Sequence, residues 1–447
     1  MFKRSILNKL GAWKRQSDRK PLVLRGARQV GKTTAVEMFS GEFDNYIYLN
    51  LERGEDRSIF REDMTVHEIF NAILIIKNIQ LREGSTLLFI DEIQNSPVAV
   101  MMLRYFHEEK KDIHVIAAGS LLEIMLDENR ISFPTGRVQF LHLYPLSFEE
   151  FLDVKGERKL LDAYYTVPVE GIIHQKLLAL FHEYTLIGGM PEIVRKYLEG
   201  TTVTGLKSTY EALMISYIND TEKYARNQTM RHVLRHCLES LPYEAGNRIK
   251  FHGFGKSQYG SREVGESMRL LEKAMLIHLI YPTTNTEPPA VPDIRKSPRL
   301  QFLDTGLLNY FAGLQQHVVK AEDLHSFYRG IIAEHVVRQE FIALDMETDR
   351  KPVFWVREKK QSNSEVDVLV PFRESLIPVE IKAGKAGTLR SLHQFIDAAP
   401  HQFAVRLWSG EVRVDPLVTS DTKRFRLLSL PYYLVGMLDS YIAKYYN

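Results

Sequence analysis

The stretch from Gly26 to Thr33 has the pattern G-x-x-x-x-G-K-T and offers the clearest chemistry in the sequence. Glycine at each end lets backbone N–H groups curl around phosphate oxygens, because no Cβ stands in the way. The lysine supplies a cation for the outer phosphates, and the threonine hydroxyl is a ligand for Mg²⁺. The pattern therefore predicts a phosphate-binding loop for ATP or ADP with Mg²⁺. The expected nucleotide contacts are Gly26, Ala27, Arg28, Gln29, Val30, Gly31, Lys32, Thr33 and Thr34.

Two adjacent carboxylates are a second source of chemistry. Asp91 and Glu92 follow the apolar run 87–90, which predicts a buried strand. The phosphate-binding loop follows another apolar run, 21–24, so both motifs would stand where parallel strands end and where such sheets bind ligands. We expect Asp91 to support Mg²⁺ and Glu92 to polarise the water that attacks the terminal phosphate.

The residues around these motifs predict an α/β fold. Ala35, Val36 and Phe39 have helical spacing and follow the loop directly. The runs 46–50 and 113–119 predict two further strands. We therefore expect a parallel sheet with the phosphate-binding loop between its first strand and its first helix.

The order of these strands resembles that of AAA+ ATPases. The resemblance implies that Ser120, at the end of a buried strand, contacts the terminal phosphate or the attacking water. It also implies that Asn50 restrains Glu92, although a strand-end cap explains Asn50 equally well. An arginine before the last core strand, Arg137 rather than Arg130, would reach the nucleotide of a neighbouring copy in a homo-oligomer. A structural salt bridge is the alternative role of Arg137.

Residues 165–225 have apolar positions at helical spacing, interrupted by the turn Gly188–Pro191. A helical lid with a GG-x-P turn resembles one group of prokaryotic and archaeal ATPases related to AAA+ and to signal-transduction ATPases. In that group the turn closes over the adenine, so the resemblance implies that Pro191 contacts the nucleotide. Arg195, one helical turn later, is either a second nucleotide sensor or a solvated helix residue.

Residues 226–315 predict several helices followed by a pair of strands. Val264, Met268, Leu271 and Met275 lie on one helical face. The arrangement resembles a winged helix, which binds DNA or serves as a protein-interaction module. More bases than acids lie here, which favours contact with phosphates of nucleic acid. The basic residues are Arg231, Arg235, Arg248, Lys250, Lys256, Arg262, Arg269, Arg295, Lys296 and Arg299.

The C-terminal region places four charged residues on apolar elements. Glu334 lies in a predicted helix, Asp367 in one predicted strand, and Glu380 and Lys382 in the next. Buried charges need partners, and Mg²⁺ bound by Asp367 and Glu380 would provide one, with Lys382 activating water. The layout resembles the PD-(D/E)xK nuclease core, which implies metal-dependent cleavage. The alternative is an ion-pair network without activity.

Composition excludes several classes of protein. A single cysteine, Cys237, excludes an intramolecular disulfide framework and a Cys-rich zinc site. The formal net charge of +2 gives no overall argument for nucleic acid, so any such argument is local. No apolar run is long enough to cross a bilayer, and the basic N-terminal segment lacks the apolar core of a signal peptide. We therefore expect a cytoplasmic protein without membrane contact.

The motifs together predict a multidomain α/β protein with an ATPase core at 1–160, a helical lid at 161–225, a winged-helix-like domain at 226–315 and a restriction-endonuclease-like domain at 316–447. The whole chain resembles a prokaryotic family that joins an AAA-type ATPase domain to a nuclease-like domain of unknown function. We expect an ATP-hydrolysing enzyme that acts on DNA. The alternatives are a slow regulatory switch that binds proteins, and a motor that acts on nucleic acid without cutting it.

Overall fold

Two structural units make up the chain, which is described by a computed structural model over residues 2–129, 136–315, 330–348, 350–357, 364–382 and 389–446. The N-terminal unit comprises Met1–Tyr144 with the short segments Lys273–Leu276 and Asp345–Asp349. The C-terminal unit comprises Pro145–Glu272, Ile277–Leu344 and Arg350–Asn447. Within the described ranges, no helix has both the length and the apolar character needed to cross a membrane.

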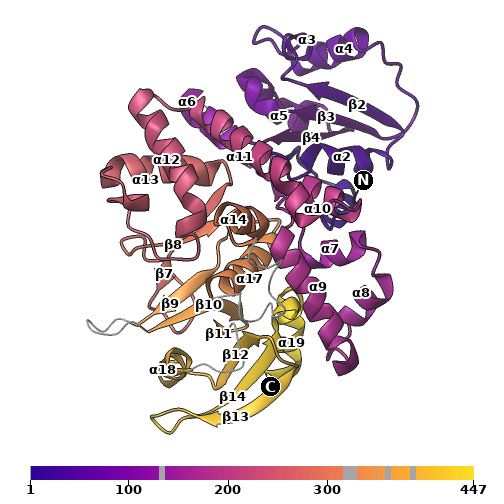
Figure 1. The fold of residues 1–447 in the computed structure, drawn as a ribbon. Coiled ribbons are helices and arrows are strands. Elements are labelled where there is room, and N and C mark those ends of the chain that lie inside the picture. The colour runs from indigo at the N-terminus through magenta and orange to yellow at the C-terminus, as the bar shows by residue number, and fades with distance from the viewer. Residues whose placement is uncertain are drawn as a thin grey trace. The chain divides into compact units, whose positions relative to one another are not determined.

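The N-terminal unit is built on a five-stranded parallel sheet with the order β2-β3-β4-β1-β5 (Figure 1). The sheet confirms the predicted α/β fold of a P-loop nucleotide-binding protein. Its inner strands β3 and β4 are buried along their whole length, as their continuous apolar sequences predict. The strands are β1 (Leu22–Arg25), β2 (Asn45–Asn50), β3 (Thr86–Asp91), β4 (Ile113–Gly119) and β5 (Gln139–His142).

Local capping signals set the starts of the helices that cover this sheet. Helix α4 begins with a capping box, in which Thr65 and Glu68 each accept the other's backbone N–H. Helix α5 begins with Ser96 as N-cap and Pro97 as its first residue. The helices of this unit are α1 (Ile6–Lys14), α2 (Lys32–Ser40), α3 (Gly54–Arg57), α4 (Val66–Ile76), η1 (Ile93–Asn95), α5 (Pro97–Glu109) and α6 (Leu122–Asn129).

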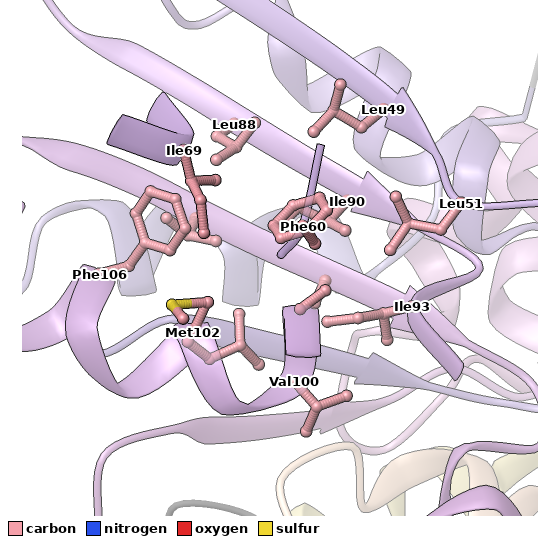
Figure 2. Close-up of a cluster of buried hydrophobic side chains, with 14 of the residues drawn as sticks. Leu49, Leu51, Phe60, Ile69, Leu88, Ile90, Ile93, Val100, Met102 and Phe106 are labelled. Carbon is pink, nitrogen blue, oxygen red and sulfur yellow. The ribbon is translucent and has the colours of Figure 1, made fainter. Parts of the chain in front are cut away.

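An apolar core fills the space between the sheet and helices α4 and α5. Figure 2 shows Leu88 and Ile90 of β3 beside Ile69 of α4 and Met102 and Phe106 of α5. All five side chains are buried, and each such burial stabilises the fold by roughly 1.5–3 kcal/mol. This core holds β3 in place, and with it the two carboxylates that follow the strand.

The C-terminal unit begins earlier than the predicted domain boundary at 160. Phe148 of α7 packs on Phe181 and Tyr184 of α9, so the segment after β5 is in the same structural unit as the helices predicted to form the lid. The helices of this unit are α7 (Phe148–Val154), α8 (Arg158–Tyr164), η2 (Gly171–Ile173), α9 (His174–Ile187), α10 (Pro191–Leu198), η3 (Val203–Leu206), α11 (Lys207–Glu222), α12 (Gln228–Glu244), η4 (Phe254–Lys256), α13 (Ser261–Lys273), α14 (Thr305–Phe311), α17 (Gly330–Leu344), α18 (Arg390–Ala398), η5 (Tyr432–Met437) and α19 (Leu438–Tyr445).

A seven-stranded mixed sheet with the order β13-β14-β12-β11-β10-β9-β7 lies in the same unit (Figure 1). Its edge strand β7 comes from the segment predicted as a separate winged-helix-like domain and pairs in parallel with β9. The predicted boundary at 315 therefore does not separate two independent sheets. The strands are β6 (Ile277–Ile280), β7 (Pro282–Thr283), β8 (Arg299–Phe302), β9 (Val353–Val356), β10 (Glu365–Phe372), β11 (Ser375–Ile381), β12 (Phe403–Trp408), β13 (Arg413–Val418) and β14 (Arg424–Pro431).

The GG-x-P turn between α9 and α10 packs against the start of α14. The Gly189 N–H donates to Asp304 at 2.7 Å, and Gly188 has a left-handed φ of 78°. Asp304 also caps α14 by accepting the Leu307 N–H at 3.0 Å. A Cβ on Gly306, inside α14, would stand 1.9 Å from the Ile187 carbonyl oxygen. Packing within the C-terminal unit thus accounts for these glycines, and the role of the turn over adenine stays a prediction.

Replacing Gly306 with alanine tests this close approach. We expect Gly306→Ala to lower the stability of the C-terminal unit by about 1–3 kcal/mol, because the added methyl group must push α14 away from α9. Gly171→Ala is the matched control, since a Cβ there would meet only Glu411 at an ordinary 3.7 Å. Thermal unfolding of both variants measures the difference. Equal midpoints for the two variants would contradict the packing described here.

Candidate nucleotide-binding site

The loop between β1 and α2 has a backbone path that depends on its two glycines. Gly31 has φ 97° and ψ 24°, a left-handed conformation that a residue with a Cβ seldom adopts, and it is the N-cap of α2. A Cβ on Gly26 would stand 2.3 Å from the Leu143 carbonyl oxygen. The sequence motif therefore folds into the strand–loop–helix arrangement that presents N–H groups and a helix N-terminus to phosphate.

Lys32 is the first residue of α2, and its ammonium group is buried against the loop. Nζ donates to the carbonyl oxygens of Gly26 and Ala27, at 2.9 Å each. Burial lowers the pKa of Lys32 to about 8, and the nearby Glu92 and Asp91 carboxylates oppose that shift. An anionic phosphate beside Nζ would favour the charged form further, which suits this lysine to a nucleotide.

Thr33 and Asp91 come together at the C-terminal end of the sheet. The Thr33 hydroxyl donates to Asp91 Oδ2 at 2.8 Å, and the Tyr48 hydroxyl approaches the same oxygen at 3.4 Å. Burial raises the pKa of Asp91, while the Thr33 hydrogen bond acts in the opposite direction. A hydroxyl and a carboxylate are the hard oxygen ligands that suit Mg²⁺. The pair therefore fits the predicted Mg²⁺, with Thr33 as ligand and Asp91 behind it.

Glu92 has an unusual backbone and a partner that the sequence did not suggest. Its φ of 52° and ψ of 43° are left-handed, which is uncommon for a glutamate and typical of functional sites. Its carboxylate accepts from Gln94 Nε2, whereas the expected partner Asn50 accepts the Glu52 N–H at 2.9 Å. Asn50 is thus a strand-end cap in this structure, which is the simpler of its two predicted roles.

Gln94 has room beside Glu92 because of a third glycine. A Cβ on Gly119, the last residue of β4, would stand 2.4 Å from Gln94 Oε1. Ser120 follows directly and is buried at the carboxyl end of β4, the edge of the sheet where β1 and β3 also end. The predicted sensor therefore stands at the correct edge, although its contact with phosphate stays a prediction. The sequence analysis did not single out Gln94, although the sequence shows an amide two residues after Glu92.

Arg137 lies at the amino-terminal end of the parallel strands, opposite the end that carries the phosphate-binding loop. It precedes β5, whose first residue pairs with Leu22 at the start of β1, and its Nε pairs with Glu108 at 2.8 Å. Arg130 lies outside the described residues. Two further predicted nucleotide contacts belong to the C-terminal unit: Pro191 is the first residue of α10, and Arg195 pairs with Glu199 at 3.0 Å on an exposed helical face.

The four predicted nuclease residues are near one another in the C-terminal unit. Lys382 Nζ pairs with Glu380 at 2.6 Å, and Asp367 accepts the Ile381 N–H at 2.9 Å. Burial raises the pKa of Asp367 to about 6 and that of Glu380 to about 8. Glu334 of α17 pairs with Arg338 at 3.0 Å. Across the described part of the chain, no group of three or more His, Cys, Asp or Glu side chains is placed to hold a metal ion.

Comparison with protein families assigns the N-terminal unit. Residues 18–152 match the family model described as an AAA domain, AAA_14, and this range holds the loop, both carboxylates and Ser120. The chain contains an AAA-type P-loop ATPase domain. Residues 178–318 and 329–418 match two models described only as domains of unknown function, DUF8612 and DUF4143. No curated protein matches the sequence.

Solved structures similar to this AAA-type protein are distant in sequence. A Walker-type ATPase of Pyrococcus abyssi has 16% identity and a TM-score of 0.43, with 70% of this chain and 96% of that chain covered. The RuvB Holliday junction branch migration motor of Thermotoga maritima has 15% identity and a TM-score of 0.29, covering 62% and 90%. The Orc1 protein of Aeropyrum pernix, in complex with DNA, has 14% identity and a TM-score of 0.28, covering 70% and 92%.

Two substitutions separate nucleotide binding from hydrolysis at this site. We expect Lys32→Ala to abolish ATP binding or hydrolysis, because the variant loses the buried cation that faces the phosphates. Glu92→Gln should still bind ATP but turn over at least about 100-fold more slowly, since an amide is not a base. Binding of a fluorescent ATP analogue and steady-state phosphate release measure the two effects. Unchanged turnover in Glu92→Gln would show that another group polarises the water.

Proposed function

We propose that this protein hydrolyses ATP at the P-loop site and uses the turnover to act on DNA. The observation that carries the first half is the Thr33–Asp91 hydrogen bond of 2.8 Å beside the buried Lys32. When bound, Mg²⁺ would supply a Lewis acid for the terminal phosphate of ATP. Lys32 and the loop N–H groups would hold the phosphates, Thr33 and Asp91 the metal, and Glu92 would accept a proton from the attacking water.

The second half of the proposal is supported by the shape of segment 226–315. Helix α12 is followed by an isolated antiparallel bridge between Arg248 and Arg299, then by α13 and the antiparallel pair β6–β8. This order of elements resembles that of a winged helix, in which the helix before the paired strands enters the major groove of DNA. Helix α13 buries Val264, Met268 and Leu271 as predicted, but it ends at Lys273, so Met275 lies beyond it. Arg262 and Arg269 are exposed on this helix.

The structure reduces the number of bases that can meet phosphates. Arg299 is only 7% exposed, so its predicted place on a DNA-binding surface is wrong. Arg235, Arg248 and Arg295 form ion pairs with Glu222, Glu365 and Asp293. The proposal therefore depends on the exposed bases around α12 and α13, which are Arg231, Lys250, Lys256, Arg262 and Arg269.

Salt-dependent DNA binding tests this assignment. We expect the double variant Arg262→Ala/Arg269→Ala to bind duplex DNA more weakly and to lower the log–log salt slope by about 0.9 for each lost phosphate contact. Arg413→Ala is the matched control, because Arg413 is exposed on β13 and pairs with Asp415. Fluorescence anisotropy with a labelled duplex over a salt series measures both quantities.

The same preparations decide between the DNA-acting enzyme and the regulatory switch. Duplex DNA should raise the ATPase rate of the unmodified protein and of Arg413→Ala, and should raise that of the double variant less. An ATPase rate that DNA leaves unchanged, together with no binding of duplex DNA, would favour the switch that binds proteins. DNA-stimulated ATPase without cutting would identify a motor.

We also propose that Arg137 acts on the nucleotide of a neighbouring copy. Its place at the amino-terminal edge of the parallel sheet, while the P-loop lies at the carboxyl edge, argues against a role at its own site. The role therefore requires a homo-oligomer. An arginine supplied in this way raises turnover by roughly 10³–10⁵-fold in other nucleotide hydrolases.

Arg104 provides a matched control for this role, because it pairs with the same Glu108 oxygen at 3.1 Å. We expect Arg137→Ala to lose most of the ATPase activity and Arg104→Ala to keep it. Mixing Arg137→Ala with Glu92→Gln should restore part of the rate, since mixed oligomers contain sites with an intact Glu92 and a neighbour's intact Arg137. Equal ATPase activity in Arg137→Ala and Arg104→Ala would show that Arg137 serves only in a structural salt bridge.

A further inference from the structure

Arg299 stands in the middle of the C-terminal carboxylate cluster. It extends from β8, and its side chain is 8% exposed. Its guanidinium lies 2.8 Å from Glu365, 3.3 Å from Asp367 and 3.7 Å from Glu334. A single buried cation thus faces three carboxylates from β10 and α17.

A second buried arginine extends this network. Arg338 is 1% exposed, pairs with Glu334 at 3.0 Å and donates to Gln301 Oε1 at 3.3 Å. Arg248 pairs with Glu365 at 2.7 Å from the other side. Every carboxylate of the described cluster therefore has a cation beside it without a metal ion. Its four cations are Arg248, Arg299, Arg338 and Lys382, and its four carboxylates are Glu334, Glu365, Asp367 and Glu380.

The oxygens that a divalent metal would need are already used. Asp367 Oδ1 accepts from Arg299 and Oδ2 accepts the Ile381 N–H, while Glu380 Oε1 accepts from Lys382. Of the four carboxylate oxygens of Asp367 and Glu380, only Glu380 Oε2 is buried without a hydrogen-bond partner among the described residues. A Mg²⁺ ion takes six oxygen ligands in a near-octahedral arrangement, and a guanidinium between the carboxylates repels it. The donor set does not fit the metal that the nuclease-like layout implies.

We propose that this cluster is a permanent ion-pair centre in which Arg299 takes the place of a metal ion and ties β8 to β10. The C-terminal sheet would then have the layout of a nuclease without binding Mg²⁺ or cutting DNA. The tie also joins the paired strands β6–β8 to the seven-stranded sheet, which β7 already does through its pairing with β9. The proposal does not depend on DNA binding by the protein.

The sign of one stability change distinguishes the two kinds of site. In a metal site without its metal, neighbouring carboxylates repel each other, so Asp367→Asn should stabilise the full-length protein in EDTA. In an ion-pair centre the same change leaves Arg299 buried with one counterion fewer, so the unfolding midpoint should fall by roughly 5–15 °C. Asp415→Asn, which removes the partner of an exposed arginine in the same sheet, should change it by at most about 2 °C.

Metal binding to the unmodified protein gives a second readout that does not require a variant to fold. Electron paramagnetic resonance measures bound Mn²⁺ in the absence of nucleotide. The unmodified protein and Glu380→Gln should bind the same amount of the ion. Incubation of labelled duplex DNA with Mn²⁺ and ATP should give no cleavage above that of Glu380→Gln. A Mn²⁺ ion that is lost in Glu380→Gln, or a higher midpoint for Asp367→Asn in EDTA, would overturn the proposal. A lower midpoint with no such ion supports it.

Discussion

The C-terminal unit depends on one helix, α17, which buries four polar side chains together with its apolar ones. His335, Arg338, Gln339 and Glu340 are all almost completely buried, and each such group must find a partner or destabilise the fold. His335 Nε2 accepts the Phe302 N–H at 3.2 Å, and Gln339 Oε1 accepts the Thr305 N–H at 2.7 Å.

Glu340, another buried polar residue of α17, finds its hydrogen-bond partners in the predicted helical lid and in α7. Its carboxylate accepts the Tyr184 hydroxyl at 2.6 Å and the N–H of Phe148, the first residue of α7. Burial raises the pKa of Glu340 to about 7, and these two hydrogen bonds favour the charged form. Because α17 thus binds α7, α9, β8 and α14 through directional bonds, its partners have little freedom to shift. The segments that read as lid, winged helix and nuclease-like domain are held as one unit for this reason.

The nucleotide site follows a different principle, since its charged groups are buried but not satisfied by one another. Lys32 donates to two loop carbonyls, and Asp91 accepts from the Thr33 hydroxyl and the Glu92 N–H, so the hydrogen bonds of both charged groups go to neutral partners. Glu92 keeps a left-handed backbone beside Gln94. Such groups are ready for an anionic ligand and its metal, whereas the carboxylates around Arg299 already have cations of their own.

The sequence by itself determined the nucleotide site, because its chemistry comes from short motifs. The loop Gly26–Thr33 and the strand before Asp91 and Glu92 carry their own glycines, apolar runs and polar ends, so local rules predicted the parallel sheet and the residues at its edge. Even Gln94 could have been suspected from its place beside Glu92. The apolar face of α13 was predictable for the same reason.

Only the tertiary structure decided what the charged residues of the C-terminal unit contact. Arg299 looked like one more base of a DNA-binding surface, and Asp367 with Glu380 looked like metal ligands. The ion pair between Arg299 and Asp367 joins two strands whose paired residues are 68 positions apart in the chain, and no local pattern specifies such a contact. The contacts between predicted domains have the same origin, because α7 packs on α9 and β7 pairs with β9. Periodicity shows that an element is buried, but the partner of a buried charge depends on which elements the fold brings together.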